Sequence, residues 1–113
     1  MNWSGGDDFI AILEYRTTAD GGRNTPAKSG YMPQVAFPFT EVQTGGRQKF
    51  IDKGIVYPGD TVKAYIKILS PHLFKKSLEE GMKFEVREGH HVTSVGTIIT
   101  ILNIDLKKDR IKI

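Results

Sequence analysis

The residues between Gly22 and Ser29 have almost the spacing of a phosphate-binding P-loop. This stretch, GRNTPAKS, lacks one glycine that the pattern requires, because Ala27 stands in its place. A P-loop binds phosphate through successive backbone N–H groups and is followed directly by a helix. Pro26 has no N–H to contribute, and Pro33 disfavours helical backbone at the residue before it. We therefore expect no nucleotide binding and no cofactor.

The histidines His72, His90 and His91 are the other residues that could hold a metal ion or transfer protons. His90 and His91 are neighbours, and neighbours on a strand point to opposite faces, so only a turn could aim both at one ion. No cysteine and no His-x-x-x-His spacing supports a zinc site. No Ser-His-Asp or Cys-His arrangement is evident, and we expect Asp7-Asp8 to be an ordinary pair of exposed acids. We therefore predict no metal site, no catalytic residues and no enzyme activity.

A length of 113 residues without cysteine predicts one small domain that needs no disulfide. No apolar run approaches the roughly 20 residues that span a bilayer, and the N-terminus lacks the basic and apolar segments of a signal peptide. We therefore expect a cytoplasmic protein without a membrane partner. The net charge of +3 permits contact with phosphate but does not require it. The most basic run, Lys107–Ile113, is either a solvated tail or a tail that contacts phosphate.

Apolar residues recur at every second position, which is the pattern of half-buried strands. In Thr61–Ile68, apolar residues alternate with threonine, lysine and tyrosine. Pro38 lies within another alternating run and places that strand at an edge or beside a bulge. The stretch 92–104 could form one long, bent strand. The expected strands are Phe9–Tyr15, Val35–Phe39, Thr61–Ile68, Met82–Arg87 and Val92–Ile104.

Turn signals separate these strands. Thr44–Gly46 is interpreted as a break between Val35–Gln43 and a short strand at Lys49–Ile51. Tyr57–Asp60 has proline and glycine in the order of a type II turn. Only Leu73–Glu80 looks helical. Short strands with regular turns favour a barrel or a sandwich.

Two further features allow a functional and a purely structural interpretation. The stretch from Thr17 to Met32 has no periodicity, and a loop of this length is either functional or an ordered surface loop folded on itself. The exposed strand residues could form a basic face with an aromatic side chain, which suits nucleic acid but also any solvated barrel face. These strand residues are Lys63, Tyr65, Lys67, Lys83 and Arg87.

Several motifs occur in the order found in the third, C-terminal domain of translation elongation factor Tu. Gly21–Pro26 (GGRNTP) and Gly30–Gln34 (GYMPQ) resemble that family's Gly-Gly-Arg-His-Thr-Pro and Gly-Tyr-Arg-Pro-Gln signature. Pro58–Asp60 matches its Pro-Gly-Asp turn, and Gly81–Gly89 (GMKFEVREG) is similar to its Gly-Leu-Arg-Phe-Ala-Ile-Arg-Glu-Gly run. The order and spacing hold from about residue 8 to residue 104, which is most of the chain.

The resemblance implies an all-β fold, a six-stranded antiparallel barrel. The barrel would cover about residues 8–104 of one domain, 1–113, with a flexible end at 1–7 and a basic tail at 105–113. In the family, this domain helps to hold the T-stem side of aminoacyl-tRNA, packs on the GTPase domain and contacts the nucleotide exchange factor. Carried over by position, the candidate RNA- or partner-binding residues are Arg23, Asn24, Gln34, Glu88, Gly89, His90 and His91.

The chain departs from the family where RNA would lie. Asn24 replaces a histidine, Met32 replaces an arginine, and His90-His91 replaces Gly-Arg. The motifs of a GTPase are absent, so we expect a stand-alone, non-catalytic barrel. We hypothesise a translation-associated module that contacts tRNA or other structured RNA. The alternative is a protein–protein interaction barrel, with a translation-related protein as partner and no RNA role.

Overall fold

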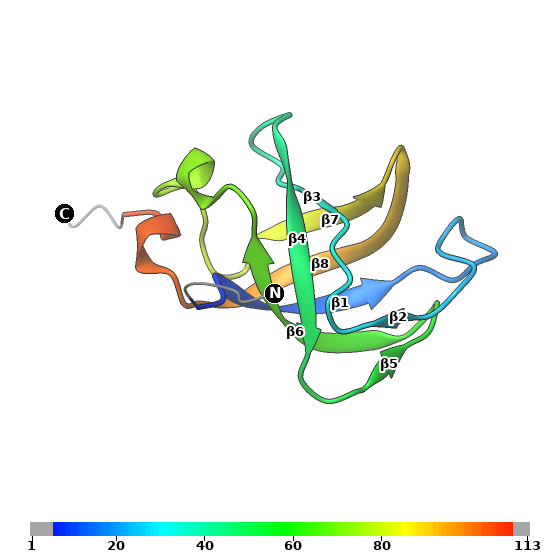
Figure 1. The fold of residues 1–113 in the computed structure, drawn as a ribbon. Coiled ribbons are helices and arrows are strands. Elements are labelled where there is room, and N and C mark those ends of the chain that lie inside the picture. The colour runs from blue at the N-terminus through cyan, green and yellow to red at the C-terminus, as the bar shows by residue number, and fades with distance from the viewer. Residues whose placement is uncertain (1–5, 110–113) are drawn as a thin grey trace.

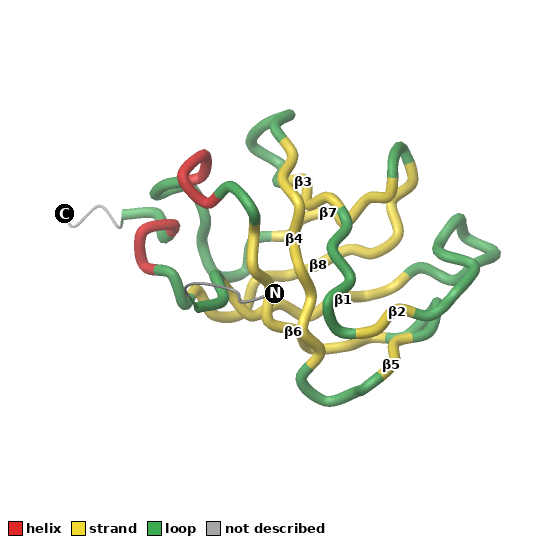
Figure 2. The backbone as a smooth tube through the Cα atoms, in the orientation of Figure 1, coloured by secondary structure: helices red, strands yellow, loops and turns green. Residues whose placement is uncertain are grey.

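The computed structural model describes residues 6–109, and most of them form a closed antiparallel barrel (Figures 1 and 2). The strand order around the barrel is β1-β6-β4-β3-β7-β8, and β2 and β5 form a separate two-stranded sheet beside it. The expected six-stranded barrel is confirmed. The strands are β1 (Phe9–Tyr15), β2 (Ala27–Lys28), β3 (Gln34–Ala36), β4 (Gln43–Phe50), β5 (Ile55–Val56), β6 (Thr61–Ile68), β7 (Lys83–Glu88) and β8 (His91–Ile101).

Strand β6, in which apolar and polar residues alternate, forms where the sequence predicts it. In β6, the four apolar residues 62, 64, 66 and 68 are at most 1 % exposed, while Thr61 and Lys63 face solvent. β1 has the bounds expected, and Tyr57–Asp60 forms the expected type II turn. Gly59 has a φ of +90°, and the Asp60 N–H donates to the Tyr57 carbonyl over 3.0 Å.

A cluster of aromatic rings fills one end of the barrel. The ring centre of Phe84 lies 5.6 Å from that of Phe9 and 5.9 Å from that of Phe37. Phe37 in turn lies 5.1 Å from Phe74. Gly96 makes room for this packing, because a Cβ at that position would stand 2.2 Å from the Phe84 ring. The aromatic cluster therefore requires glycine at position 96, within strand β8, although there is no turn at this position.

The expected break at Thr44–Gly46 is wrong. These residues lie inside the continuous strand β4, which pairs with β3 and β6. A Cβ on Gly46 would stand 2.4 Å from Cγ2 of Val35, and one on Gly45 would stand 2.9 Å from Cδ1 of Leu69. The glycines permit close packing across the barrel wall instead of a turn.

The ends of two other strands differ from the sequence expectation. β3 ends at Ala36, because the chain then turns so that Phe37 enters the core and Phe39, 47 % exposed, stacks on it. β8 ends at residue 101, and its pairing skips Thr93 opposite β7 and Ile99 opposite β1. Such skipped residues are β-bulges, which bend the long strand.

The segment expected to be helical, Leu73–Glu80, is mostly not a helix. Only a 3-10 turn, η1 (Pro71–Phe74), forms at its start. The backbone N–H groups of Ser77 and Leu78 donate to the carbonyl of Leu106 over 3.0 and 2.8 Å. Pairing with a distant segment therefore replaces the local helix.

The same contacts revise the C-terminal boundary. A second 3-10 turn, η2 (Ile104–Leu106), follows β8, and Leu106 is 1 % exposed and packs into the core cluster. The Lys108 N–H donates to the Leu78 carbonyl over 2.7 Å. Ordered structure thus continues into the expected tail of 105–113. Residues 1–5 and 110–113 of the expected flexible ends lie outside the described residues, and the single domain over 1–113 stays a prediction.

The long stretch 17–32 is an ordered loop. Its β2 segment pairs with β5, and the Gly22 N–H donates to the Thr17 carbonyl over 2.9 Å. Further along, the Gly30 N–H donates to the Gln48 carbonyl over 2.8 Å, which ties the loop to β4. Within residues 6–109, no helix is long and apolar enough to cross a membrane.

Candidate binding surface at the loop end of the barrel

An ion pair joins the long loop to the hairpin between β7 and β8. The guanidinium Nη1 of Arg23 contacts the carboxylate Oε2 of Glu88, the last residue of β7, and the Tyr31 hydroxyl donates to the same oxygen. The guanidinium also lies 4.4 Å from the centre of the Tyr31 ring, a cation–π contact. Its Nε donates to the Thr25 carbonyl over 3.2 Å. We call Arg23, Tyr31 and Glu88 the loop clamp.

The environment of the clamp favours a charged arginine and neutral tyrosines. Burial raises the pKa of Tyr31 to about 12, and its hydrogen bond to Glu88 acts in the same direction. Burial opposes the charge of Arg23, but its interactions with Tyr31 and Glu88 outweigh this effect and raise its pKa. Deeper in the barrel, the Tyr15 hydroxyl donates to Oε1 of Gln48, and burial raises the pKa of Tyr15 as well.

Arg23 therefore has a positioning role. Its side chain is only 18 % exposed, and Glu88 already balances its charge within the chain. Arg23, a candidate RNA- or partner-binding residue from the sequence, is thus already engaged within the chain. Sequence reasoning missed the clamp because Arg23 and Glu88 are 65 positions apart and no local pattern links them.

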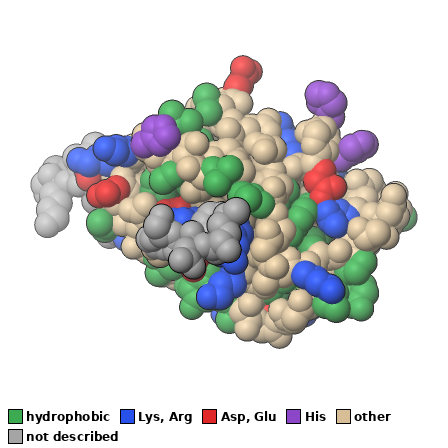
Figure 3. All heavy atoms as spheres, in the orientation of Figure 1, with side chains coloured by type: hydrophobic (Ala, Val, Ile, Leu, Met, Phe, Trp, Pro, Cys, Tyr) green, Lys and Arg blue, Asp and Glu red, His purple; other side chains and the backbone are tan. Residues whose placement is uncertain are grey.

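The other candidate residues gather at the same end of the barrel and face solvent. Gln34 begins β3 and pairs with Arg87, one residue before Glu88. The turn after β7 holds Gly89, whose φ of +61° lies in the left-handed region that glycine tolerates. Figure 3 shows histidine side chains protruding from this end of the molecule. The exposed candidates are Asn24, Gln34, Gly89, His90 and His91.

One comparison with known proteins identifies the family. The model of the elongation factor Tu C-terminal domain family matches residues 6–102. The chain belongs to this family. The match confirms the resemblance seen in the motifs, and it covers both the loop and the hairpin that the clamp joins. The matched family is a non-catalytic domain of the elongation factor.

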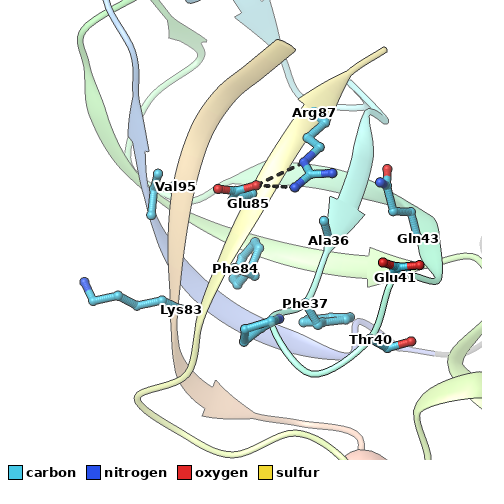
Figure 4. Close-up of a pocket in the computed structure, with 11 residues that line it drawn as sticks. Ala36, Phe37, Thr40, Glu41, Gln43, Lys83, Phe84, Glu85, Arg87 and Val95 are labelled. Carbon is cyan, nitrogen blue, oxygen red and sulfur yellow. Dashed lines mark hydrogen bonds and ion pairs between the residues drawn. The ribbon is translucent and has the colours of Figure 1, made fainter. Parts of the chain in front are cut away.

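The barrel also has an open groove between the 37–43 turn and β7 (Figure 4). The groove has a volume of about 720 Å³, and Phe37 and Phe84 belong to its lining. Arg87 spans part of it and donates to Oε1 of Glu85 from Nε over 3.0 Å and from Nη2 over 2.5 Å. Of the charged residues that line the groove, Glu85 and Arg87 are thus paired with each other.

The expected basic face is divided between two parts of the barrel. Lys63, Tyr65 and Lys67 point outward from β6, whereas Lys83 and Arg87 lie on β7, and two strands separate β6 from β7 in either direction. Within residues 6–109, no group of three or more His, Cys, Asp or Glu side chains could hold a metal ion. The functional candidates are therefore the loop end, the groove and the outward face of β6.

Proposed function

We propose that the chain is a non-catalytic, translation-associated binding module whose loop end contacts tRNA or another structured RNA. The support is the family match together with the loop clamp, which holds the long loop against the β7–β8 hairpin before any partner arrives. Preorganised loops lose less conformational entropy on binding. The module needs no nucleotide, and the cytoplasmic location expected from the sequence stays a prediction.

The chemistry offered by the loop end is mainly that of neutral hydrogen-bonding groups. Asn24 and Gln34 present exposed amides, and Gly89 leaves open space where a side chain would stand. Amides and backbone N–H groups bind phosphate and ribose oxygens and fix the orientation of an RNA without reading its sequence. This supports recognition of RNA shape at the loop end, with Arg23 and Glu88 as positioning residues.

The test is an NMR titration of the isotope-labelled protein with tRNA at low and moderate salt. A small surface makes few contacts, so we expect a dissociation constant on the order of 10⁻⁴ to 10⁻⁵ M. The exposed loop-end groups are mainly uncharged, so this dissociation constant should rise only slightly with salt. Shifts should cluster at Asn24, Gln34 and residues 88–91. No shifts at low salt, or shifts confined to the groove, would refute the RNA proposal.

A matched pair of variants sharpens this test. Gln34→Glu introduces a negative charge at the loop end without changing side-chain shape, and it should weaken tRNA binding about fivefold, since a charge about 4 Å from a phosphate costs roughly 1 kcal/mol in water. Gln43→Glu makes the same change on β4, where the residue is also exposed. Because Gln43 lines the groove instead, its substitution should leave tRNA binding unchanged.

The alternative function, a protein–protein interaction barrel, is supported by exposed apolar side chains near the groove. Phe39, Val42 and Leu73 are 47, 49 and 53 % exposed, and such residues often mark protein contacts when they form one patch. Under this alternative, Phe39→Ser would abolish capture of a translation-related protein, and the Gln34→Glu variant would retain it.

A further inference from the structure

The outer face of β4 and β6 carries positive charges that no acid on either strand balances. The register places Lys49 of β4 directly opposite Tyr65 of β6, and Arg47 opposite Lys67. Lys63 lies two residues before Tyr65 on the same face. Neither β4 nor β6 contains an Asp or Glu residue. Figure 3 shows Lys and Arg side chains on the front of the molecule, where Figure 1 places these strands.

Neighbouring segments leave the lysine charges largely available. On β1, which pairs with β6, the one acid is Glu14, opposite Thr61 at one end of the face. At the other end, Asp8 is 2 % exposed, and its carboxylate accepts hydrogen bonds from the Ile68 N–H and the Asn103 amide. Lys67 donates to the Gly6 carbonyl over 3.0 Å, which satisfies a donor but leaves the charge.

An aromatic ring lies in the middle of these charges. Successive outward residues on a strand are about 6.6 Å apart and neighbouring strands about 4.8 Å apart, so Lys49, Lys63 and Lys67 all lie within one side-chain length of Tyr65. The Lys49 ammonium is 5.7 Å from the centre of the Tyr65 ring. Arg47 already has an interaction of its own, so the argument rests on the three lysines and the tyrosine.

We propose that this face binds a single-stranded RNA segment, with a base stacked on Tyr65 and phosphates contacted by Lys49, Lys63 and Lys67. Single strands are bound in this way, by aromatic platforms set among positive charges. A base that stacks on Tyr65 displaces the Lys49 ammonium toward the adjacent phosphate. The face lies on different strands from the loop end, so the proposal does not depend on the loop end binding tRNA.

The geometry favours RNA over an acidic polypeptide. A peptide commonly binds a sheet by adding a strand to an open edge. β6 is paired with β1 and β4, and β4 is paired with β6 and β3, so neither strand offers an edge. Recognition must then use side chains alone. A ring surrounded by ammonium groups matches a base between phosphates, whereas the carboxylates of an acidic peptide would pair with the ammonium groups and leave the ring without an aromatic partner.

The experiment measures fluorescence anisotropy of a labelled ten-nucleotide oligouridine RNA between 50 and 200 mM KCl. The double variant Lys49→Gln/Lys67→Gln should bind at least tenfold more weakly at 50 mM KCl. The slope of log K against log[KCl] should become shallower by about 1.4, because each phosphate contact on a single strand contributes about 0.7. The control, Lys75→Gln/Lys108→Gln, removes the same charge from exposed residues elsewhere and should change neither quantity.

The aromatic contribution is tested separately from charge. Tyr65→Leu should weaken oligouridine binding about tenfold without changing the salt slope, and Tyr65→Phe should bind as the parent does, because stacking needs only the ring. Thermal melting checks that all variants remain folded. Equal losses for the two lysine double variants would overturn the proposal. So would tight binding of a polyglutamate peptide that is lost in the Lys49/Lys67 variant, since the occupant would then be an acidic protein.

Discussion

Glu88→Gln tests whether the loop clamp holds the long loop in place. The substitution keeps the side-chain shape but removes the charge that Arg23 and Tyr31 both contact through Oε2. Hydrogen bonds to a charged partner contribute about 1.5–3 kcal/mol each, and neutral ones about 0.5–1.5 kcal/mol. Two weakened bonds would thus cost about 2–3 kcal/mol in a dry site.

Solvent reduces this loss. The Glu88 side chain is 40 % exposed, so screening by water lowers the expected loss of unfolding free energy to about 1.5 kcal/mol. The entropy of unfolding is about 2.1 cal/mol/K per residue, so for a chain of this length a loss of about 1.5 kcal/mol corresponds to a fall in Tm of about 6 °C. Urea denaturation should show the same loss with an unchanged m-value, since the surface exposed on unfolding is the same.

The chain supplies a closely matched control. Glu85 lies on the same strand, is 42 % exposed and pairs with Arg87 only two residues away. Because this ion pair lies within one strand and joins no distant segments, Glu85→Gln should lower the unfolding free energy by about 0.5 kcal/mol or less. Brief trypsin digestion under native conditions gives a second readout. Cleavage after Arg23 should accelerate in Glu88→Gln and stay slow in Glu85→Gln.

Equal stability losses in the two variants, with no difference in cleavage after Arg23, would refute the clamp. The loop would then be held by its backbone hydrogen bonds and by β2 alone. A large loss in Glu88→Gln without faster cleavage would show that the carboxylate stabilises the hairpin and not the loop.

Three further outcomes are expected. Gly46→Ala should lower the unfolding free energy measured in urea by about 1–3 kcal/mol, because the new Cβ would clash with Val35. Gly54→Ala is the control and should change the unfolding free energy little, because a Cβ at position 54 would have no atom within 4 Å. The raised pKa of Tyr31 favours its neutral form in the folded state, so unfolding free energy should fall as pH rises from about 10 to about 12. Tyr31→Phe should reduce this dependence, and the raised pKa of Tyr15 accounts for the part that remains. Excess EDTA should leave Tm unchanged, and a lower Tm would instead point to a metal at the histidines.

The fold could be predicted where one local pattern decided the structure. β6 has the expected bounds because apolar and polar residues alternate along it, and β1 because it is a mostly apolar run; in both strands alternate residues are buried. The prediction failed at Gly45-Gly46 because glycine signals a turn locally but here makes room for Val35 and Leu69. It also failed at Leu73–Glu80, where hydrogen bonds to the distant Leu106, rather than local helix propensity, determine the backbone conformation.

The candidate site could likewise be predicted only in part. The family motifs indicated the loop and the hairpin, and the structure places the two next to each other. They could not show that Arg23 is engaged by Glu88, since that depends on how distant segments meet. The wrong prediction of a break at Gly45-Gly46 also explains why the basic face was not predicted in full. A break there would end β4 before Arg47, so the sequence did not predict that Arg47 lies opposite Lys67 and Lys49 opposite Tyr65.

The loop end and the β4–β6 face differ in the kind of contact they offer. At the loop end, the clamp neutralises Arg23, and exposed Asn24 and Gln34 contribute uncharged groups. On the β4–β6 face, Lys49 and Lys67 keep their charge. Counterion release makes charged contacts sensitive to salt, whereas neutral hydrogen bonds are much less so. Salt dependence of RNA binding therefore reports mainly on the lysine face, and a contact that persists at higher salt reports on the loop end.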